Sequence, residues 1–358
     1  MLPVTLLTGL DEGFLGAVAA NLLAAAGPTG VLVEYDVSAL SDGSVVRIAR
    51  TATGVIDREV ITMGHPCVSC AMRGSLVQLL ASIAAVERYD AAIVNVPAAG
   101  DTQAIATEID ADADLLVDAA VTTIDTATVV ADLTGDELIR DRGIPTAAED
   151  GRALAEVIVH QLEYADAAIL TGDSTAVAVL RAINPRLLVR TTPAGLLGVR
   201  LHVPGRVLEA GSIAAPDEQT LVWQSGRPFH PERLYDALED LVAGTARGRG
   251  TLWIATQHRH RIGWDSFGAN ISLGVLGPWL ADLPADRWAA VGQQHQARSA
   301  LEWHPQYGDR ASYLSFTGPD LNLRELRSRL DGCVLRADEA VHPLTDPFAP
   351  YLEGSTAA

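Results

Sequence analysis

The stretch Pro3-Val4-Thr5-Leu6-Leu7-Thr8-Gly9 begins the chain with an apolar run that ends in a glycine. Such a run predicts a buried strand that is followed by a tight turn. Residues 17–26 are rich in Ala and Leu and are closed by Gly27-Pro28, which predicts a helix. A strand, a glycine turn and a helix in this order predict the first half of a βαβ unit, and therefore a parallel sheet covered by helices.

The same alternation continues through the first 200 residues. Apolar runs predict strands at residues 30–36, 44–50, 55–61, 91–96, 115–124, 167–170 and 187–190. Helical periodicity predicts helices at residues 73–86, 153–164 and 176–182. We therefore expect an α/β fold with a mostly parallel sheet and helices on both of its faces.

The character of the sequence changes after about residue 195, where Gly, Pro and Ala dominate and periodicity is weak. Short strands are then predicted at 220–224, 251–256 and 270–275, and helices at 231–242 and 320–330. We expect a smaller α+β domain that holds all six tryptophans, most of them in its core. The predicted organisation is a domain at 1–195, a linker at 196–218, a second domain at 219–342 and a disordered tail at 343–358.

The charge of the chain restricts its partners. All 26 basic side chains are arginine, there is no lysine, and 45 acidic residues give a net charge of −19. A phosphate backbone repels so acidic a protein, so we expect no direct nucleic-acid binding through a broad basic face. A basic protein, a metal cation or a small ligand is the better match.

Three cysteines stand at Cys67, Cys70 and Cys333, which is not the disulfide framework of a small secreted protein. Cys333 is expected to be a packed apolar residue. The first residues read as a strand and not as a signal peptide. No apolar run has the roughly 18–20 residues that span a bilayer. We therefore expect a cytoplasmic protein without a membrane span.

Three segments resemble the CobW-like metal-linked GTPases. They are residues 3–9, Cys67-Val68-Ser69-Cys70-Ala71-Met72-Arg73-Gly74-Ser75-Leu76, and Trp223-Gln224-Ser225-Gly226-Arg227-Pro228-Phe229-His230-Pro231-Glu232-Arg233-Leu234. The Cys-Val-Ser-Cys motif is similar to that of the actinobacterial branch that recruits a ribosome hibernation factor. The resemblance implies a P-loop-NTPase-like first domain and a CobW-type C-terminal domain. It also implies zinc, and a ribosome hibernation factor or ribosomal protein as partner.

The nucleotide motifs of that family are altered here. If Gly9 is the first glycine of the phosphate loop, the family's lysine falls at Leu15 and its Mg²⁺-binding residue at Gly16. Gly9, Gly13 and Gly16 then remain as a degenerate loop. Asp11 and Glu12 add two carboxylates where backbone N–H groups would cradle a polyphosphate.

Two further motifs have changed in the same direction. The family's acidic residue after the strand 91–96 becomes Asn95, and its Asn-Lys-x-Asp becomes Thr171-Gly172-Asp173-Ser174. Asp173, one position out of register, is the weak candidate for guanine recognition. We therefore expect a pseudo-GTPase with no catalytic residues, to which neither GTP nor Mg²⁺ binds.

The candidate metal ligands surround the cysteine pair. Cys67 and Cys70 precede the helix predicted at 73–86, and a helix N-terminus lowers the pKa of a thiol and favours metal binding. His65 is the best third ligand, and Glu34 (or Asp36) is a weaker oxygen candidate. The family's Cys-x-Cys-Cys has Ser69 in place of its middle thiol. The resemblance suggests zinc, whereas the spacing alone also allows a reversible disulfide or an apolar pair.

These features favour a zinc-linked, nucleotide-degenerate adaptor that binds a basic protein partner. One alternative is a zinc metallochaperone with residual GTP binding or hydrolysis. A second alternative is a metal-independent protein-interaction module that uses the Trp-rich C-terminal domain.

Overall fold

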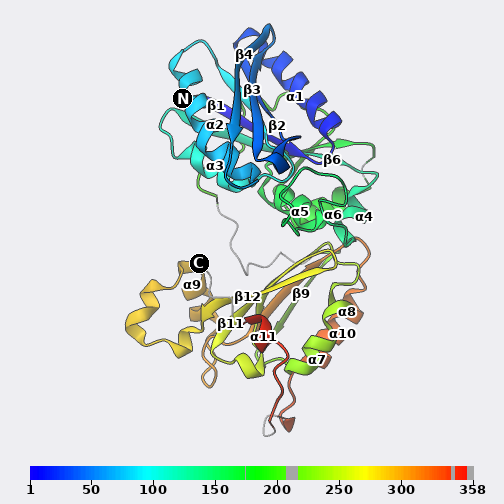
Figure 1. The fold of residues 1–358 in the computed structure, drawn as a ribbon. Coiled ribbons are helices and arrows are strands. Elements are labelled where there is room, and N and C mark those ends of the chain that lie inside the picture. The colour runs from blue at the N-terminus through cyan, green and yellow to red at the C-terminus, as the bar shows by residue number, and fades with distance from the viewer. Residues whose placement is uncertain (174, 207–216, 340–342, 353–358) are drawn as a thin grey trace. The chain divides into compact units, whose positions relative to one another are not determined.

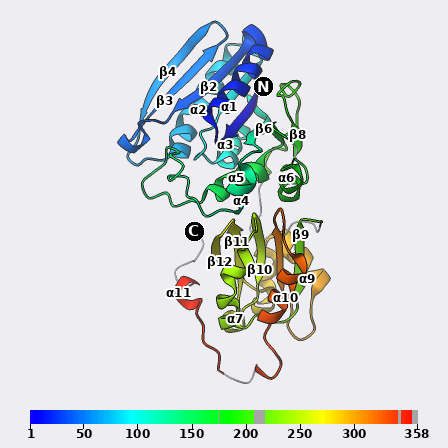
Figure 2. The same cartoon turned by 90° about the vertical axis from the view of Figure 1, so that its right-hand side faces the viewer.

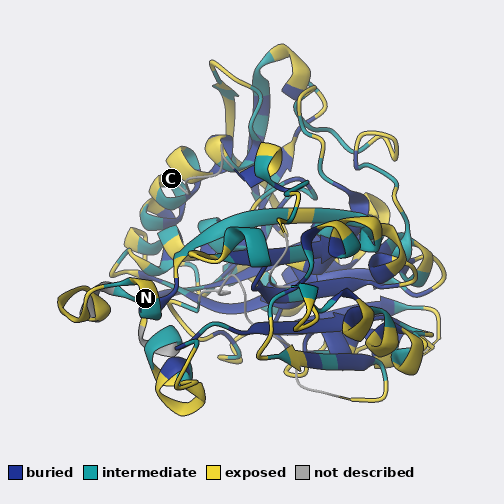
Figure 3. Cartoon of the chain, turned by 90° about the horizontal axis from the view of Figure 1, so that it is seen from below, coloured by how far each residue is buried: buried dark blue, intermediate teal, exposed yellow. Residues whose placement is uncertain are grey.

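The computed structural model describes residues 1–173, 175–206, 217–339 and 343–352. It divides into two compact units, Met1–Leu208 and Glu209–Ala358. Figures 1 and 2 show the elements of each unit in two views. Buried residues follow the strands, and exposed residues cover the outer faces of the helices and the loops (Figure 3).

The first unit is built on an eight-stranded sheet in the order β4-β3-β2-β5-β1-β6-β7-β8. The six strands from β2 to β8 are parallel, and β3 and β4 extend one edge as an antiparallel pair. This confirms the predicted α/β class with a mostly parallel sheet. The strands are β1 (Leu2–Gly9), β2 (Gly30–Asp36), β3 (Ser44–Thr51), β4 (Gly54–Thr62), β5 (Ala91–Asn95), β6 (Leu115–Asp125), β7 (Ala167–Thr171) and β8 (Leu188–Arg190).

Helices cover both faces of this sheet. Figure 1 shows α1 (Glu12–Ala26) on one side and α2 (Val68–Ala85) and α3 (Thr102–Asp110) on the other. The remaining helices are α4 (Val129–Thr134), α5 (Leu154–Tyr164) and α6 (Val177–Ile183). The sequence pattern did not predict α3 and α4, because nine and six residues give too little periodicity.

Among the described helices, α2 has the length and apolar composition to cross a membrane. Six of its residues are nevertheless buried in the protein, among them Met72, Leu76 and Leu80. Core helices of globular proteins pass the same test of length and composition.

The segment after β8 belongs to the first unit. Leu196 is 1% exposed and packs in the same core as Leu15 and Leu22 of α1. The backbone N–H groups of Leu201 and His202 both donate to the carbonyl oxygen of Asp118. The predicted linker is therefore held against the first unit at Leu196, Leu201 and His202, and residues 207–216 lie outside the described part of the chain.

The second unit is a five-stranded antiparallel sheet in the order β12-β11-β10-β13-β9, packed against α7, α8 and α10. The strands are β9 (Thr220–Ser225), β10 (Arg247–Leu252), β11 (His260–Phe267), β12 (Asn270–Pro278) and β13 (Ser312–Thr317). The helices are α7 (Pro231–Asp236), α8 (Leu238–Val242), α9 (Gln293–Glu302), α10 (Leu323–Cys333) and α11 (Ala349–Leu352). The helix predicted at 231–242 is divided at Ala237.

Aromatic side chains fill the core of this unit. Trp223 stacks on Phe229 with ring centroids 5.1 Å apart, and Trp264 meets Phe316 edge to face. Phe348 and Leu352 belong to the same core, so residues 343–352 are not the disordered tail that was predicted. Of the six tryptophans, Trp288 and Trp303 are the two that are exposed.

The centre of the first unit depends on a close approach between β1 and β6. A Cβ atom on Gly9 would lie 1.9 Å from Oγ1 of Thr123 on β6. Gly9 is therefore fixed by packing at the end of the central strand. Gly16, one turn into α1, has no atom within 4 Å of such a Cβ.

We predict opposite effects for alanine at these two glycines. Gly9→Ala forces apart two strands in the core and should lower the free energy of unfolding by about 1–3 kcal/mol. Gly16→Ala fills open space and removes a helix-interior glycine, so it should raise that free energy by up to about 1 kcal/mol. Urea denaturation of both variants checks this, and equal stability would contradict the packing at Gly9.

Candidate metal centre

Three side chains with metal-binding atoms meet at the start of α2. The ligand atoms of His65, Cys67 and Cys70 all lie within 4.8 Å of one another. His65 comes from the connection between β4 and α2, and the two cysteines come from the first turn of the helix. The structure thus brings together the three nitrogen and sulfur ligands that the sequence predicted.

Local helix geometry positions the two sulfur atoms. Cys67 is the N-cap of α2 with extended backbone angles (φ −142°, ψ 110°), and its Sγ accepts the backbone N–H of Cys70 at 3.3 Å. A helix leaves its first N–H groups without internal partners, so a capping sulfur that accepts one of them is held over the first turn. Cys70 is the third residue of the same helix, which places both thiols on one turn.

Ser69 has a different role from its cysteine neighbours. Its Oγ accepts the backbone N–H of Asp101 at 2.9 Å. Asp101 is the N-cap of α3, so this hydrogen bond joins the starts of α2 and α3. The position at which the resembling family has a third thiol therefore serves as a link between two helices.

The donor set fits a zinc ion. Two thiolates and one imidazole are ligands that Zn²⁺ prefers, and zinc usually takes four ligands in tetrahedral geometry. His65 and Cys70 are exposed and Cys67 is half-buried, so a bound ion would be reachable from solvent. The group supplies three ligands and leaves one coordination position to water or to another molecule.

The prediction of a lowered thiol pKa is wrong at Cys70, where the pKa is raised. Its hydrogen bond with Cys67, partial burial and the charge of the neighbouring sulfur raise the pKa of Cys70, and the guanidinium of Arg73 partly opposes this. Arg73 itself is bound to Glu108, with Nε 2.5 Å from the carboxylate. Two thiols side by side resist the loss of both protons, and a cation removes that resistance.

Glu34 does not join the metal group. Its carboxylate is paired with Arg50 on the neighbouring strand β3, with Nε and Oε2 2.6 Å apart. Asp36, the other oxygen candidate, accepts the backbone N–H of Ser38 at 3.0 Å. The structure therefore brings the predicted nitrogen and sulfur candidates together, whereas the carboxylate of Glu34 is paired with Arg50.

The turn where a phosphate loop would lie is short. Only Leu10 and Asp11 separate β1 from α1, and Asp11 is the N-cap whose carboxylate accepts the N–H of Phe14 at 2.9 Å. A Cβ on Gly13 would lie 3.2 Å from that same carboxylate oxygen. The N-terminal N–H groups that bind phosphate in nucleotide-binding helices thus face a carboxylate of the chain itself.

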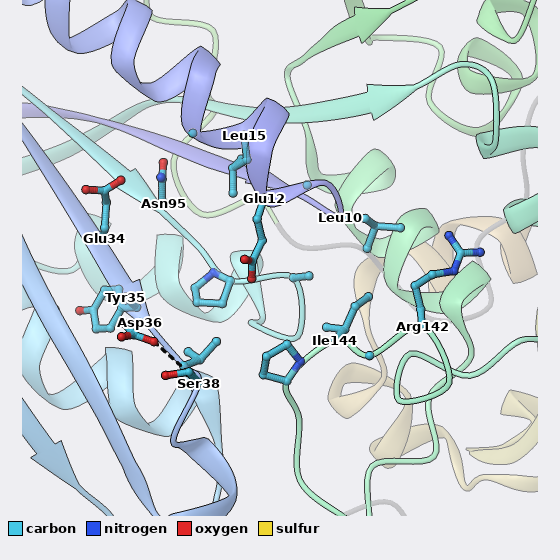
Figure 4. Close-up of a pocket in the computed structure, with 17 residues that line it drawn as sticks. Leu10, Glu12, Leu15, Glu34, Tyr35, Asp36, Ser38, Asn95, Arg142 and Ile144 are labelled. Atoms are coloured by element: carbon cyan, nitrogen blue, oxygen red, sulfur yellow. Dashed lines mark hydrogen bonds between the residues drawn. The ribbon is translucent and has the colours of Figure 1, made fainter.

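A cavity of about 600 Å³ adjoins this turn at the carboxyl ends of the parallel strands. Figure 4 shows Glu12 and Leu15 of α1, Glu34 of β2 and Asn95 of β5 around it, with the guanidinium of Arg142 pointing away from Glu12. The Oδ1 atom of Asn95 is buried and lacks a hydrogen-bond partner among the described residues.

The charges around this cavity do not suit a polyphosphate. Arg142 is the basic residue among those that line it, and it is paired with Asp132 at 2.7 Å and Glu137 at 2.5 Å. Glu12, Glu34 and Asp36 line the same cavity. Their carboxylates would repel phosphate oxygens.

The candidate for guanine recognition lies elsewhere. The carboxylate of exposed Asp173 accepts the backbone N–H of Thr175 at 3.0 Å and its hydroxyl at 2.6 Å. Asp173 lines neither the cavity above nor a smaller one of about 290 Å³ beside Asp125. Ser174, the last residue of that motif, lies outside the described residues.

A known protein family matches most of the second unit. Residues 219–334 match the family described as cobalamin synthesis protein cobW C-terminal domain. The matched segment contains the five-stranded sheet together with α7, α8 and α10.

Similarity to known proteins extends beyond residues 219–334. A zinc chaperone of Mycobacterium tuberculosis is 28% identical over 387 aligned residues, which cover 98% of this chain and 93% of the relative. Zinc-regulated GTPase metalloprotein activator 1 of Dictyostelium discoideum is 25% identical over 329 residues, which cover 81% of this chain and 69% of that protein. Among solved structures, the Zn(II)-bound YjiA GTPase from E. coli matches with a TM-score of 0.36 and 17% identity, over 93% of this chain and 99% of the other.

Sequence reasoning missed two features of the site. Asp11 stands directly before a helical segment, which is the ordinary signal of an N-cap, but the resemblance assigned it to a phosphate loop. The bond between Ser69 and Asp101 joins residues 32 positions apart, and no local pattern predicts it.

We predict that the cap at Asp11 contributes to stability. Asp11→Ala leaves the N–H of Phe14 without its acceptor and should lower the free energy of unfolding by about 1 kcal/mol. Asp11→Asn keeps the oxygen and serves as the matched control, with a change near zero. Thermal unfolding of the three proteins measures this, and equal loss in both variants would argue against a capping role.

Proposed function

We propose that this protein is a zinc carrier that binds one Zn²⁺ through His65, Cys67 and Cys70 and passes it to a protein partner. The observation that carries the proposal is the convergence of these three ligand atoms within 4.8 Å at the exposed start of α2. The mycobacterial relative named a zinc chaperone aligns with 98% of the chain and supports the same function.

The number of ligands favours a carrier over a structural zinc site. Structural sites close the coordination shell with four protein ligands, whereas the residues that the structure describes place three here, and two of them are exposed. A donor atom from a partner can enter the open position before any protein ligand leaves. The metal would then move by stepwise ligand exchange without passing through free solution.

We further propose that the carrier works without GTP. The chain has no lysine for a phosphate loop. The Asp11 carboxylate accepts the backbone N–H of Phe14 in the first turn of α1. Glu12, Asp36 and Glu34 line the cavity where a triphosphate and its metal would have to fit. These features together disfavour polyphosphate binding by charge and by geometry.

A second candidate function is the zinc-linked adaptor, in which a basic protein such as a ribosome hibernation factor or ribosomal protein docks on the first unit. Charge favours it: residues 1–208 hold 26 of the 45 acidic and 13 of the 26 basic residues, and so carry 13 of the 19 excess negative charges. Asp101 and Glu108 lie on α3 and its cap, which the Ser69 hydrogen bond joins to the metal group. Salt-sensitive co-sedimentation with ribosomes would support the adaptor function, and a lack of co-sedimentation would contradict it.

We predict that metal-free, reduced protein takes up one Zn²⁺ per chain in isothermal titration. Cys67→Ser and Cys70→Ser should each abolish stoichiometric uptake, because a serine hydroxyl is a poor zinc ligand. Cys333→Ser is the matched control, since Cys333 is buried in the second unit, and it should bind as the unchanged protein does. Stoichiometric binding that survives the Cys67→Ser and Cys70→Ser changes would place the metal elsewhere.

We also predict no saturable heat on titration with Mg²⁺-GTP, whether or not zinc is bound, and no phosphate release above that of buffer. Leu15→Lys alone should not restore binding, because Asp11 and Asn95 are unchanged. Binding of GTP at micromolar strength would overturn the nucleotide-independent carrier and support a GTP-dependent metallochaperone.

A further inference from the structure

We propose that Cys67 and Cys70 are also a thiol–disulfide exchange site, which reacts with small-molecule disulfides and releases zinc as it closes. The zinc release rests on the function proposed above, whereas the exchange reaction does not. The inference comes from the placement of the two thiols on one turn of α2.

The two sulfur atoms are already oriented for bond formation. Sγ of Cys67 lies over the first turn because it accepts the N–H of Cys70, and the two sulfurs lie within 4.8 Å. A disulfide needs them about 2.05 Å apart, with their Cα atoms about 4.4–6.8 Å from each other. Residues three apart at the start of a helix meet that spacing, so rotation of the side chains is sufficient and α2 stays folded.

Solvent exposure favours the reaction of a small disulfide at Cys67 and Cys70 over its reaction at Cys333. Cys70 is exposed and Cys67 is half-buried, so a small disulfide reaches Cys70 first. Cys333 is 4% exposed in the core of the second unit, so a small disulfide does not reach it. Ser69 occupies the middle position of the motif, so no third thiol lies in the turn to divert the reaction.

The reaction balances with a small disulfide, RSSR, as the oxidant. The thiolate of Cys70 attacks one sulfur of RSSR, which forms a mixed disulfide and releases RS⁻. The thiolate of Cys67 then attacks Sγ of Cys70, which closes the protein disulfide and releases the second RS⁻. Two protein thiolates are oxidised, one RSSR is reduced to two thiolates, and Zn²⁺ keeps its charge.

Closure removes two of the three zinc ligands and leaves His65 alone. A single imidazole does not retain zinc against competing ligands in solution. The metal-loaded state of the carrier would therefore depend on the thiol–disulfide balance around it. Reduction of the disulfide restores both thiolates and the site.

The test uses the full-length, zinc-loaded protein without oxygen, treated with glutathione disulfide. Released zinc is followed with a chromogenic chelator, free thiols with a maleimide, and the protein by intact mass. We expect one zinc released for every two thiols lost, with no glutathione retained, and rebinding of zinc after reduction with dithiothreitol. Cys333→Ser is the matched control and should behave in the same way.

Two variants separate the steps. Cys67→Ser leaves Cys70 without a resolving thiol, so it should retain one glutathione as a stable mixed disulfide. His65→Ala should bind zinc more weakly and still close the disulfide. Oxidation of both thiols while zinc stays bound, retention of glutathione by the unchanged protein, or no reaction at all would each overturn the inference.

The two proposals fail in different ways. If the reduced protein binds no zinc, the carrier function fails, and intact mass still shows whether the disulfide closes. If zinc binds stoichiometrically and glutathione disulfide does not release it, the carrier function stands and the coupled release is wrong.

Discussion

The contact between the end of β1 and β6 is the constraint on which the first unit depends. β1 is the central strand, and Gly9 lies so close to Thr123 that no side chain fits there. This packing fixes where the strand ends, and α1 then begins after two residues. The turn has two residues, and Asp11 completes it by capping the helix. The opening of the chain therefore stabilises the fold at the place where a nucleotide-binding protein would hold its ligand.

The metal centre arises from the same kind of local rule at a second helix. The first N–H groups of α2 need acceptors, and the sulfur of Cys67 provides one. The atom that caps the helix is thus also the proposed metal ligand, and the cap holds it in place without a metal. The hydrogen bond from Asp101 to Ser69 fixes the start of α2 against α3, so the site rests on a supported helix end.

The proposed zinc binding and the proposed disulfide exchange would both follow from one arrangement of thiols. Thiolates close enough to share a cation are also close enough to form a bond to each other once they lose electrons. Exposure allows both a partner ligand and a small oxidant to approach. A fourth protein ligand would have blocked both reactions, and Glu34, the candidate for that position, is held by Arg50.

The sequence by itself predicted the strands of the first unit and its helices other than α3 and α4, because apolar periodicity and glycine turns act over a few residues. It also predicted that His65, Cys67 and Cys70 would lie together, because they are within six positions of one another in the chain. Only the tertiary structure decided that Arg50 pairs with Glu34, that Leu196 packs in one core with α1, and that Phe348 and Leu352 pack in the core of the second unit. Those contacts join residues on different elements, and a side chain's partner across a sheet or in a core is fixed by strand order and packing, which no local pattern records.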